Sequence, residues 1–303
     1  MSKFHINVCP LCGNNQFNHH MDCIDYYASG ETFKICQCKA CGFLFTQDAP
    51  IESQIGRYYE TPTYISHSDT HKGLINSIYH LVRKRMLHRK YKLITRLTGL
   101  SNGRLLDIGT GTGYFPNYMQ QKGWTVEAIE KSAQARTFAK EHFALNVYDD
   151  TYLTRLTDKK FDVITLWHVL EHLEPINDVW KVFYKLLTDN GILIIAVPNS
   201  NSYDAKRYNE YWAAYDVPRH LWHFTPNTMQ QFGAKHDFIL AEQQPMPFDA
   251  FYISMLSEKY QKKHMPFLKG MYAGTIAWFQ TLAQKENSSS MIYILRKKAH
   301  EKK

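Results

Sequence analysis

The 303-residue sequence has no cysteine after position 41, no internal repeat and no extended low-complexity tract. It also lacks long apolar runs. The most apolar stretch of its C-terminal part, Met271–Phe279, is far shorter than the roughly 20 residues of a membrane-spanning helix. The opening residues, "MSKFHINV", have no apolar core of signal-peptide length. These absences argue against repeat, membrane-spanning and secreted proteins, so we expect a cytoplasmic protein.

Apolar residues are plentiful, at 44% of the chain, which is enough for one large domain and a small one. The net charge is +8. A positive charge of this size permits a nucleic acid, an anionic membrane surface or an acidic small molecule as partner, and it does not decide among them.

The six cysteines all lie in the first 41 residues, and four of them form two pairs of identical form, "CPLCG" and "CKACG". Thiolates three residues apart in a tight turn can hold one edge of a metal ion, and the following glycine tolerates the positive φ of that turn. The spacing predicts a structural zinc ribbon over residues 1–50. A rubredoxin-like iron site and paired disulfides are the alternatives. The predicted ligands, which leave out Cys23 and Cys36, are Cys9, Cys12, Cys38 and Cys41.

Residues 51–100 are expected to form a helical linker or lid. An irregular aromatic stretch, Arg57–Asp69, precedes a helical pattern from Gly73 to Leu97, in which apolar residues mostly recur every three or four positions. Basic residues cover the rest of this helix. A solvated face is favoured over a nucleic-acid surface.

From residue 101 to 303 short apolar strands alternate with helices. Gly103–Phe115, "GRLLDIGTGTGYF", reads as a buried strand and a glycine-rich turn, and the next strand ends at Glu130. After a third strand that ends near Asp149, the fourth and fifth strands follow in Phe161–Leu173 and Gly191–Asn199. This alternation predicts an α/β fold with a doubly wound parallel sheet and a ligand over the strand ends. A carboxylate at the tip of the second strand can bind both ribose hydroxyls.

An acidic residue, Asp107, stands two positions before the first glycine of the loop, Gly109. A carboxylate there would repel a pyrophosphate but suits a cationic amino-acid ligand. At this point the chain, from about Asn102 to its end, resembles the class I S-adenosylmethionine-dependent methyltransferases. The motifs that carry the resemblance are "LDIGTGTG", "AIEKS", "FDVITLWHVLEHL" and "NGILIIAVPN", and "VLEHL" with Pro175 is similar to the quinone-biosynthesis branch.

The resemblance implies a seven-stranded, mostly parallel, Rossmann-like sheet. Its last two strands would be "FILAEQQPMPF" and "SMIYILRKK", the final one inserted antiparallel. It also implies S-adenosyl-L-methionine as cofactor, with Glu130 on the ribose and the region Asp149–Thr151 near the adenine. The expected cofactor-binding residues are Asp107, Gly109, Thr110, Gly111, Gly113, Glu130, Asp150 and Trp167.

"WHVLEHL" contains His168, Glu171 and His172, which spell the inverted zinc-protease motif. We reject that reading because the segment leaves a parallel strand. Some small-RNA 2′-O-methyltransferases hold a divalent cation with Glu-x-x-Glu-His here and a distant histidine. This chain has His168 in place of the first glutamate, and His220 or His223 would complete the set. The alternative is a helix in which Glu171 and His172 shape the pocket floor.

A proline-rich polar loop, "AAYDVPRHLWHFTP" over Ala213–Pro226, follows the fifth strand. The fold would place it beside the methyl donor, so residues 200–230 are expected to form the acceptor site, and residues 250–285 a helical insertion. Arg219 could clamp an acidic acceptor, with His220 as base and His168 as a further catalytic candidate. The alternative is an Asp216–Arg219 ion pair that braces the loop. "FTP" predicts a helix start at Thr225.

Three functions remain open on these grounds. The favoured one is methyl transfer to a small-molecule, saccharide-like or lipid-linked acceptor, with at most weak peripheral membrane contact. The second is an RNA methyltransferase in which the ribbon and the basic helix hold RNA. The third is a cofactor-binding scaffold without turnover.

Overall fold

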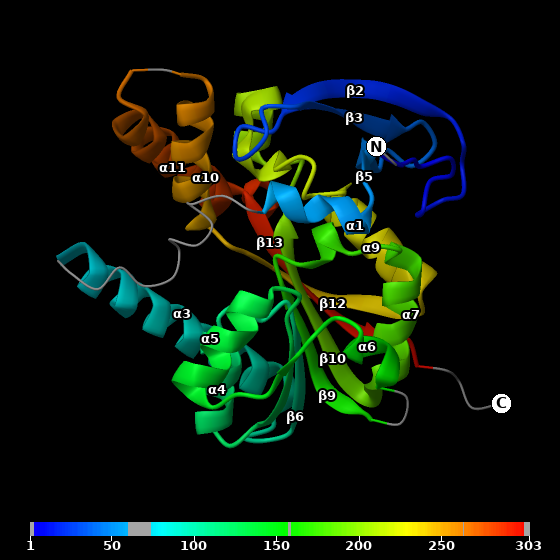
Figure 1. The fold of residues 1–303 in the computed structure, drawn as a ribbon, viewed down its shortest axis with the longest axis vertical. Helices are drawn as coiled ribbons and strands as arrows, with labels where there is room; N and C mark the ends of the chain where they lie inside the picture. Colours follow the sequence, from blue (N-terminus) through cyan, green and yellow to red (C-terminus); the bar gives the residue numbers. More distant parts are fainter. Residues whose placement is uncertain (1–2, 60–73, 157–158, 263, 300–303) are drawn as a thin grey trace.

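A seven-stranded sheet forms the centre of the computed structural model, which describes residues 3–59, 74–156, 159–262 and 264–299 (Figure 1). The strand order is β12-β13-β10-β9-β6-β7-β8, and β13 alone runs antiparallel to its neighbours. This confirms the predicted doubly wound sheet and its inserted last strand. The strands are β6 (Arg104–Ile108), β7 (Thr125–Ile129), β8 (Val147–Tyr148), β9 (Phe161–Trp167), β10 (Leu187–Pro198), β12 (Phe238–Pro245) and β13 (Ser290–Lys297).

Successive side chains of a strand point to opposite faces of a sheet. Alternate residues of the strands therefore pack into two separate hydrophobic clusters, one on each face. On β10, Ile192 and Ile194 pack with α3 (Leu74–Thr98) and α4 (Tyr114–Gln121). Leu193 and Ile195 face the opposite cluster, to which α7 (Ile176–Leu186) and α9 (Pro226–Lys235) contribute. Helices α5 (Ala133–Phe143) and α6 (Tyr152–Arg155) complete the crossover connections. Both faces of the parallel strands are therefore covered (Figure 1).

The N-terminal ribbon contains β2 (Phe17–Ile24), β3 (Thr32–Cys38) and β4 (Leu44–Gln47), and its sheet has a fourth strand from elsewhere. That strand, β11 (Trp222–His223), belongs to the polar loop and pairs antiparallel with β4. A second small pairing joins β1 (Lys3–Phe4) to β5 (Ala49–Pro50). β11 covers the edge that β4 would otherwise expose. The N-terminal ribbon and the polar loop therefore share one four-stranded sheet.

The linker has short helical turns, α1 (Glu52–Ile55) and η1 (Gly56–Tyr58), and then the single long helix α3. Of the expected irregular aromatic stretch only the part up to Tyr59 falls within the described residues. One basic residue of α3, Lys90, is not on a solvated face. Its Nζ lies 3.9 Å from the centroid of the Trp167 ring.

Between β10 and β13 the chain adds the turns that carry the polar loop and a helical hairpin. α8 (Tyr203–Tyr208) and η3 (Asn209–Tyr211) precede the polar loop, and η4 (Ala213–Tyr215) begins it. The turn η2 (Leu170–His172), which follows β9, contacts β11 of this loop. Thr225 caps α9 through a capping box with Thr228, as "FTP" predicted. The expected insertion is a pair of packed helices, α10 (Asp249–Tyr260) and α11 (Pro266–Ala283), followed by η5 (Lys285–Asn287). Among the described helices none is long and apolar enough to cross a membrane.

Candidate active site and metal centre

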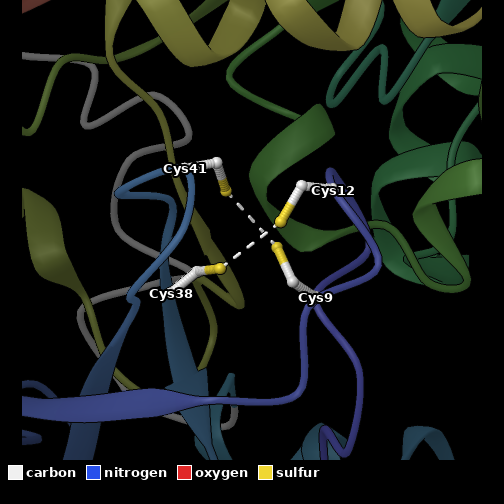
Figure 2. Close-up of side chains that lie close together, drawn as sticks. All are labelled: Cys9, Cys12, Cys38 and Cys41. Atoms are coloured by element: carbon white, nitrogen blue, oxygen red, sulfur yellow. Dashed lines mark hydrogen bonds between the residues drawn. The ribbon is translucent and has the colours of Figure 1, made fainter.

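The four predicted cysteine ligands converge on one point (Figure 2). Cys9 Sγ lies 3.6 Å from Cys41 Sγ, and Cys12 Sγ lies 3.5 Å from Cys38 Sγ. These separations are too long for disulfides, whose S–S bond is about 2.05 Å. They are close to the edges of about 3.8 Å expected for a tetrahedron with metal–sulfur bonds of about 2.3 Å. The set therefore fits a tetrahedral metal such as zinc, without Cys23 or Cys36.

The glycines of both knuckles have the positive φ that the spacing argument requires. Gly13 and Gly42 have φ values of 79° and 75°. Burial raises the pKa of the Cys9 thiol to about 11. A bound dication would reverse that shift because it favours the thiolate, which is the form that coordinates metal.

The glycine loop after β6 leaves no room for larger residues at its first position. Gly109 has a φ of 69°, and a Cβ there would lie 2.2 Å from Cγ2 of Val169. Gly111 has a φ of 57°, but a Cβ on it would meet open space, so the backbone there faces the cavity. Gly113, with a φ of 85°, stands at the N-terminus of α4. The loop can thus bring backbone amides close to a ligand.

Glu130 follows β7 at the same edge of the sheet. Its two carboxylate oxygens each accept a backbone N–H at 2.8 Å, from Gly111 and from Ser132. These bonds fix the carboxylate beside the glycine loop. Asp150 and Thr151 line the same cavity. The structure therefore brings together three of the predicted cofactor-binding regions.

Asp107 lies beneath this loop rather than on the cavity wall. Thr165 Oγ1 donates to its Oδ1 at 2.6 Å. Burial raises the pKa of Asp107 to about 6. Burial also lowers the pKa of Lys90 to about 8, although Asp107 opposes that shift. Sequence reasoning missed Lys90 because it counted all the cations of α3 as one solvated face.

A cavity of about 1980 Å³ extends from the glycine loop to the polar loop and α10. Gly109 and Glu130 line one part of it, and Glu171, His172 and His220 line another. Apolar side chains form much of the rest of the wall, among them Val82, Met86, Phe248, Tyr252, Ile253 and Leu256. The cavity has room for a cofactor and an acceptor side by side.

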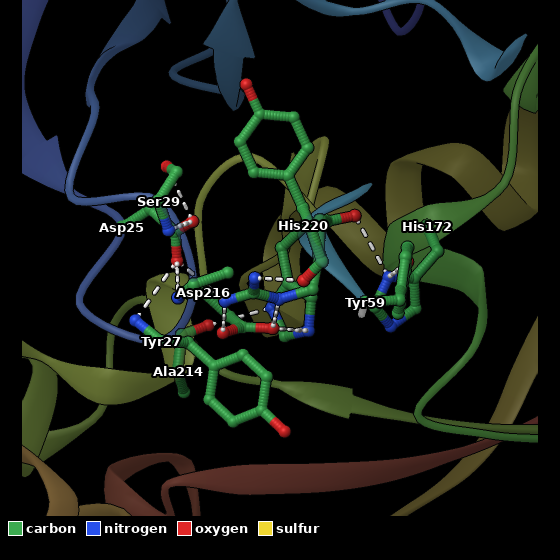
Figure 3. Close-up of polar contacts among 11 residues, drawn as sticks. Asp25, Tyr27, Ser29, Tyr59, His172, Ala214, Asp216 and His220 are labelled. Atoms are coloured by element: carbon green, nitrogen blue, oxygen red, sulfur yellow. Dashed lines mark hydrogen bonds and ion pairs between the residues drawn. The ribbon is translucent and has the colours of Figure 1, made fainter. Parts of the chain in front are cut away.

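Glu171, His172 and His220 offer ligand atoms that all lie within 4.8 Å of one another. Figure 3 shows His172 and His220 approaching from different elements, and their ring centroids are 4.6 Å apart. His172 Nδ1 donates to the carbonyl of Arg219 at 2.9 Å, and His220 Nδ1 donates to the carbonyl of Ala214 at 2.9 Å. Because a carbonyl only accepts, each neutral ring has its lone pair at Nε2.

Glu171 is fully buried, and neither of its carboxylate oxygens accepts a hydrogen bond from a residue that the structure describes. Oε1 lies 3.6 Å from Nδ1 of His168, whose Nε2 in turn lies 3.3 Å from Oδ2 of Asp249. Burial lowers the pKa of His168, but the two carboxylates outweigh it and raise that pKa to about 10. Burial and His220 lower the pKa of His172 to about 4. His168 is therefore cationic at neutral pH, and His172 is neutral.

Arg219 is buried and engaged by protein groups on every side. Its Nε and Nη2 donate to the two oxygens of Asp216, at 2.9 and 2.6 Å, and Nη2 also reaches Asp25 at 3.1 Å. Nη1 donates to the carbonyl of Tyr58 at 2.8 Å. Of the two sequence-based interpretations, the ion pair with Asp216 is the one observed. Asp25, which lies in the ribbon (Figure 3), was not foreseen as its second partner.

His223 does not join Glu171 and His172, so one of the two histidines proposed for that cluster is ruled out in favour of His220. Nε2 of His223 lies 3.0 Å from Thr46 Oγ1, which itself donates to the carbonyl of His220. The reason is the pairing of β11 with β4, which turns His223 toward the ribbon. Trp167 contacts Phe115 and Lys90 and is not among the cavity-lining residues.

Comparison with known families identifies the kind of domain that contains the glycine loop. A family model described as "Methyltransferase domain" matches residues 81–243, more than half of the chain. The chain belongs to this methyltransferase family. With the glycine loop and Glu130 in place, it is an S-adenosylmethionine-dependent methyltransferase.

Individual relatives are distant. An uncharacterized methyltransferase of Staphylococcus carnosus is 26% identical over 46% of this chain and 68% of its own length. A ubiquinone biosynthesis O-methyltransferase of Pelagibacter ubique is 33% identical over 38% of this chain, and the match spans half of that relative. A putative sarcosine dimethylglycine methyltransferase of Galdieria sulphuraria superposes with a TM-score of 0.51 and 13% identity, over 72% of this chain and 86% of its own. The last likeness shows the shared fold.

Replacing Glu130 by Ala is expected to weaken S-adenosylmethionine binding by roughly ten- to a hundredfold, because hydrogen bonds to a charged group contribute about 1.5–3 kcal/mol. Gly109→Val should weaken it as well, since its side chain would collide with Val169. Glu127→Ala is the matched control, because Glu127 lies on β7, which Glu130 directly follows, but pairs with Lys159. Calorimetry that shows NAD binding and no S-adenosylmethionine binding by the wild type would contradict the assignment.

Proposed function

We propose that the protein transfers the methyl group of S-adenosylmethionine to a hydroxyl group of an amphiphilic small-molecule or lipid-linked acceptor. The observation that carries the proposal is the buried cluster of Glu171, His172 and His220, which shares one cavity with the glycine loop and Glu130. A hydroxyl group must lose a proton as it attacks, and the imidazoles of His172 and His220 line the cavity, where either could accept it.

In this proposal the cofactor lies over Gly109 and Gly111, with its ribose on Glu130. When bound it supplies an electrophilic methyl group. The acceptor hydroxyl lies against Nε2 of His220, which takes its proton, while the bond from Nδ1 to the Ala214 carbonyl holds the ring in place. The buried carboxylate of Glu171 stabilises the resulting imidazolium. Positioning of the acceptor beside the methyl donor supplies the remaining rate enhancement.

Arg219 has a bracing role in this proposal instead of an acceptor-clamping one, because its donors are engaged by Asp25, Asp216 and Tyr58. His168 orients Glu171 and Asp249 as a fixed cation. The apolar wall of the cavity, which includes Phe248, Tyr252 and Leu256, favours an acceptor with an apolar body over a nucleotide. The relatives named as ubiquinone biosynthesis O-methyltransferases are consistent with such an acceptor.

A divalent cation is a second candidate for the same cluster. Each histidine offers Nε2 while Nδ1 donates to a backbone carbonyl, which is the usual arrangement around a metal-ligating histidine. A cation there would lower the pKa of an acceptor hydroxyl. Against it stands the cationic His168, 3.6 Å from Oε1 of Glu171, which already compensates that carboxylate. For the ribbon we propose zinc, the common occupant of four-thiolate sites with this spacing.

The test is product identification. Purified protein is incubated with methyl-labelled S-adenosylmethionine and separate lipid, polar-metabolite and RNA fractions, and labelled products are identified by mass and fragmentation. We expect a methyl ether in the lipid or apolar fraction. Label in RNA, retained with a steep dependence on salt, would overturn the proposal in favour of the RNA alternative.

A further inference from the structure

Helix α11 exposes its large apolar residues and packs its small ones, the reverse of an ordinary surface helix. Its buried residues are Gly270, Ala273, Gly274, Ala277 and Thr281. Its exposed large apolar residues are Phe267, Leu268, Met271, Tyr272, Phe279 and Leu282, with exposed fractions between 37% and 68%. Such a contiguous apolar surface marks an interaction site.

The helix cannot rotate to hide these residues, because its glycines fix its contact with α10. A Cβ on Gly270 would lie 2.5 Å from Cα of Met255, and a Cβ on Gly274 would lie 2.8 Å from Cα of Phe251. The two backbones therefore touch along a small-xxx-small face, and the opposite face must point outward. Figure 1 shows the hairpin of α10 and α11 projecting from the body of the molecule, away from the sheet.

The hairpin's surface charge is positive. Lys259, Lys262 and Lys269 are exposed near its tip. Within the described residues 249–262 and 264–283 the acidic residues are Asp249 and Glu258, and both turn inward. Asp249 faces His168, and Glu258 is 2% exposed and accepts a hydrogen bond from Tyr208 Oη.

The hairpin also contributes exposed apolar residues to the cavity wall. Phe248 and Tyr252, at the start of α10, line the cavity and are each about half exposed, at 53% and 49%. On the facing helix α3, Arg89 lies over the Phe248 ring at 5.7 Å. Exposed apolar side chains of α10 and the basic side chain of Arg89 therefore lie together on the cavity wall.

We propose that the α10–α11 hairpin docks on an anionic lipid bilayer, with α11 lying in the plane of the interface. Exposed aromatic and aliphatic residues would enter the headgroup region, and the lysines would bind lipid phosphates. A second copy of the chain is a poorer occupant. A self-complementary contact would bring two sets of lysines together without exposed carboxylates on either hairpin.

The experiment is sedimentation of the full chain with vesicles of phosphatidylcholine alone or mixed with phosphatidylglycerol. We expect binding to the mixed vesicles that weakens as salt rises. The triple variant Phe267→Ser, Leu268→Ser, Tyr272→Ser should lower the partition coefficient at least tenfold. Lys262→Gln with Lys269→Gln should lower it by roughly 25-fold, about fivefold for each lysine.

The matched control is Val8→Ser with Ile239→Ser, which removes similarly exposed apolar residues, at 54% and 51%, outside the hairpin. This variant should bind vesicles like the wild type, and circular dichroism should show all variants folded. Vesicle binding by the triple variant equal to that of the wild type would overturn the proposal. A wild-type dimer in solution that dissociates in the triple variant would overturn it as well. The vesicles contain neither cofactor nor acceptor, so failure here leaves the proposed hydroxyl methylation standing.

Discussion

Cys38→Ser is expected to lose the bound metal and to reduce methyl transfer at least a hundredfold, although Cys38 belongs to the ribbon and not to the cavity. Structural zinc sites stabilise small domains by roughly 10 kcal/mol or more, so an empty ribbon should unfold locally. Its sheet contains β11, which lies in the acceptor loop. The ribbon also supplies Asp25 to Arg219. Loss of the ribbon should therefore release the loop that carries His220.

The measurements are metal content, turnover and cofactor affinity. The wild type should hold about one zinc per chain, and Cys38→Ser should hold none while still binding S-adenosylmethionine, because Gly109 and Glu130 directly follow β6 and β7 of the central sheet. Cys36→Ser is the control, since Cys36 lies on the same strand outside the four-sulfur set. Unchanged metal content in Cys38→Ser would refute the site. Normal turnover without metal would refute the link between ribbon and loop.

The features that the sequence predicted correctly rest on local patterns. Each depends on residues that are close together in the chain: the two cysteine knuckles, the tight glycine turn after β6, the alternation of strands and helices, and the cap at Thr225. These patterns allow few alternative structures, because the glycines that adopt a positive φ and the cysteines that supply a pair of thiolates are close neighbours in the sequence. The antiparallel last strand came from the family resemblance, since no local pattern encodes strand direction.

The missed features depend on contacts between distant residues. Asp25 and Arg219 are 194 positions apart, and the hydrogen bond from Thr46 to the His220 carbonyl spans 174. The local sequence around each of these residues does not distinguish it from an ordinary surface residue. The choice of His220 over His223 for the cluster likewise follows from the register of β11 against β4. Lys90 was assigned to the solvated face because helical periodicity shows only which residues share a face of α3. It does not show that the ring of Trp167 packs against one of them.

Turnover should fall at least a hundredfold in His220→Asn, with cofactor affinity within about twofold of wild type. The asparagine amide can still donate to the Ala214 carbonyl, as Nδ1 does, but it has no basic atom at the position of Nε2. General-base catalysis contributes roughly 10²- to 10⁴-fold. Glu171→Gln should behave similarly, because it removes the buried charge that stabilises the imidazolium. His236→Asn is the control, since His236 pairs with Asn177 on α7.

Three outcomes separate the roles of this cluster. If His220 acts as a base alone, a chelator that leaves the ribbon loaded has no effect, and the variants lose rate at all metal concentrations. If a cation is bound, His172→Asn should match Glu171→Gln, and added divalent metal should restore part of the activity. If the loop is only structural, His220→Asn should lower the melting temperature and cofactor affinity together, as Arg219→Ala should by leaving Asp25 and Asp216 unpaired. Normal turnover in both His220→Asn and Glu171→Gln would show that the cluster takes no part in the reaction, because these substitutions directly remove Nε2 of His220 and the charge of the buried carboxylate.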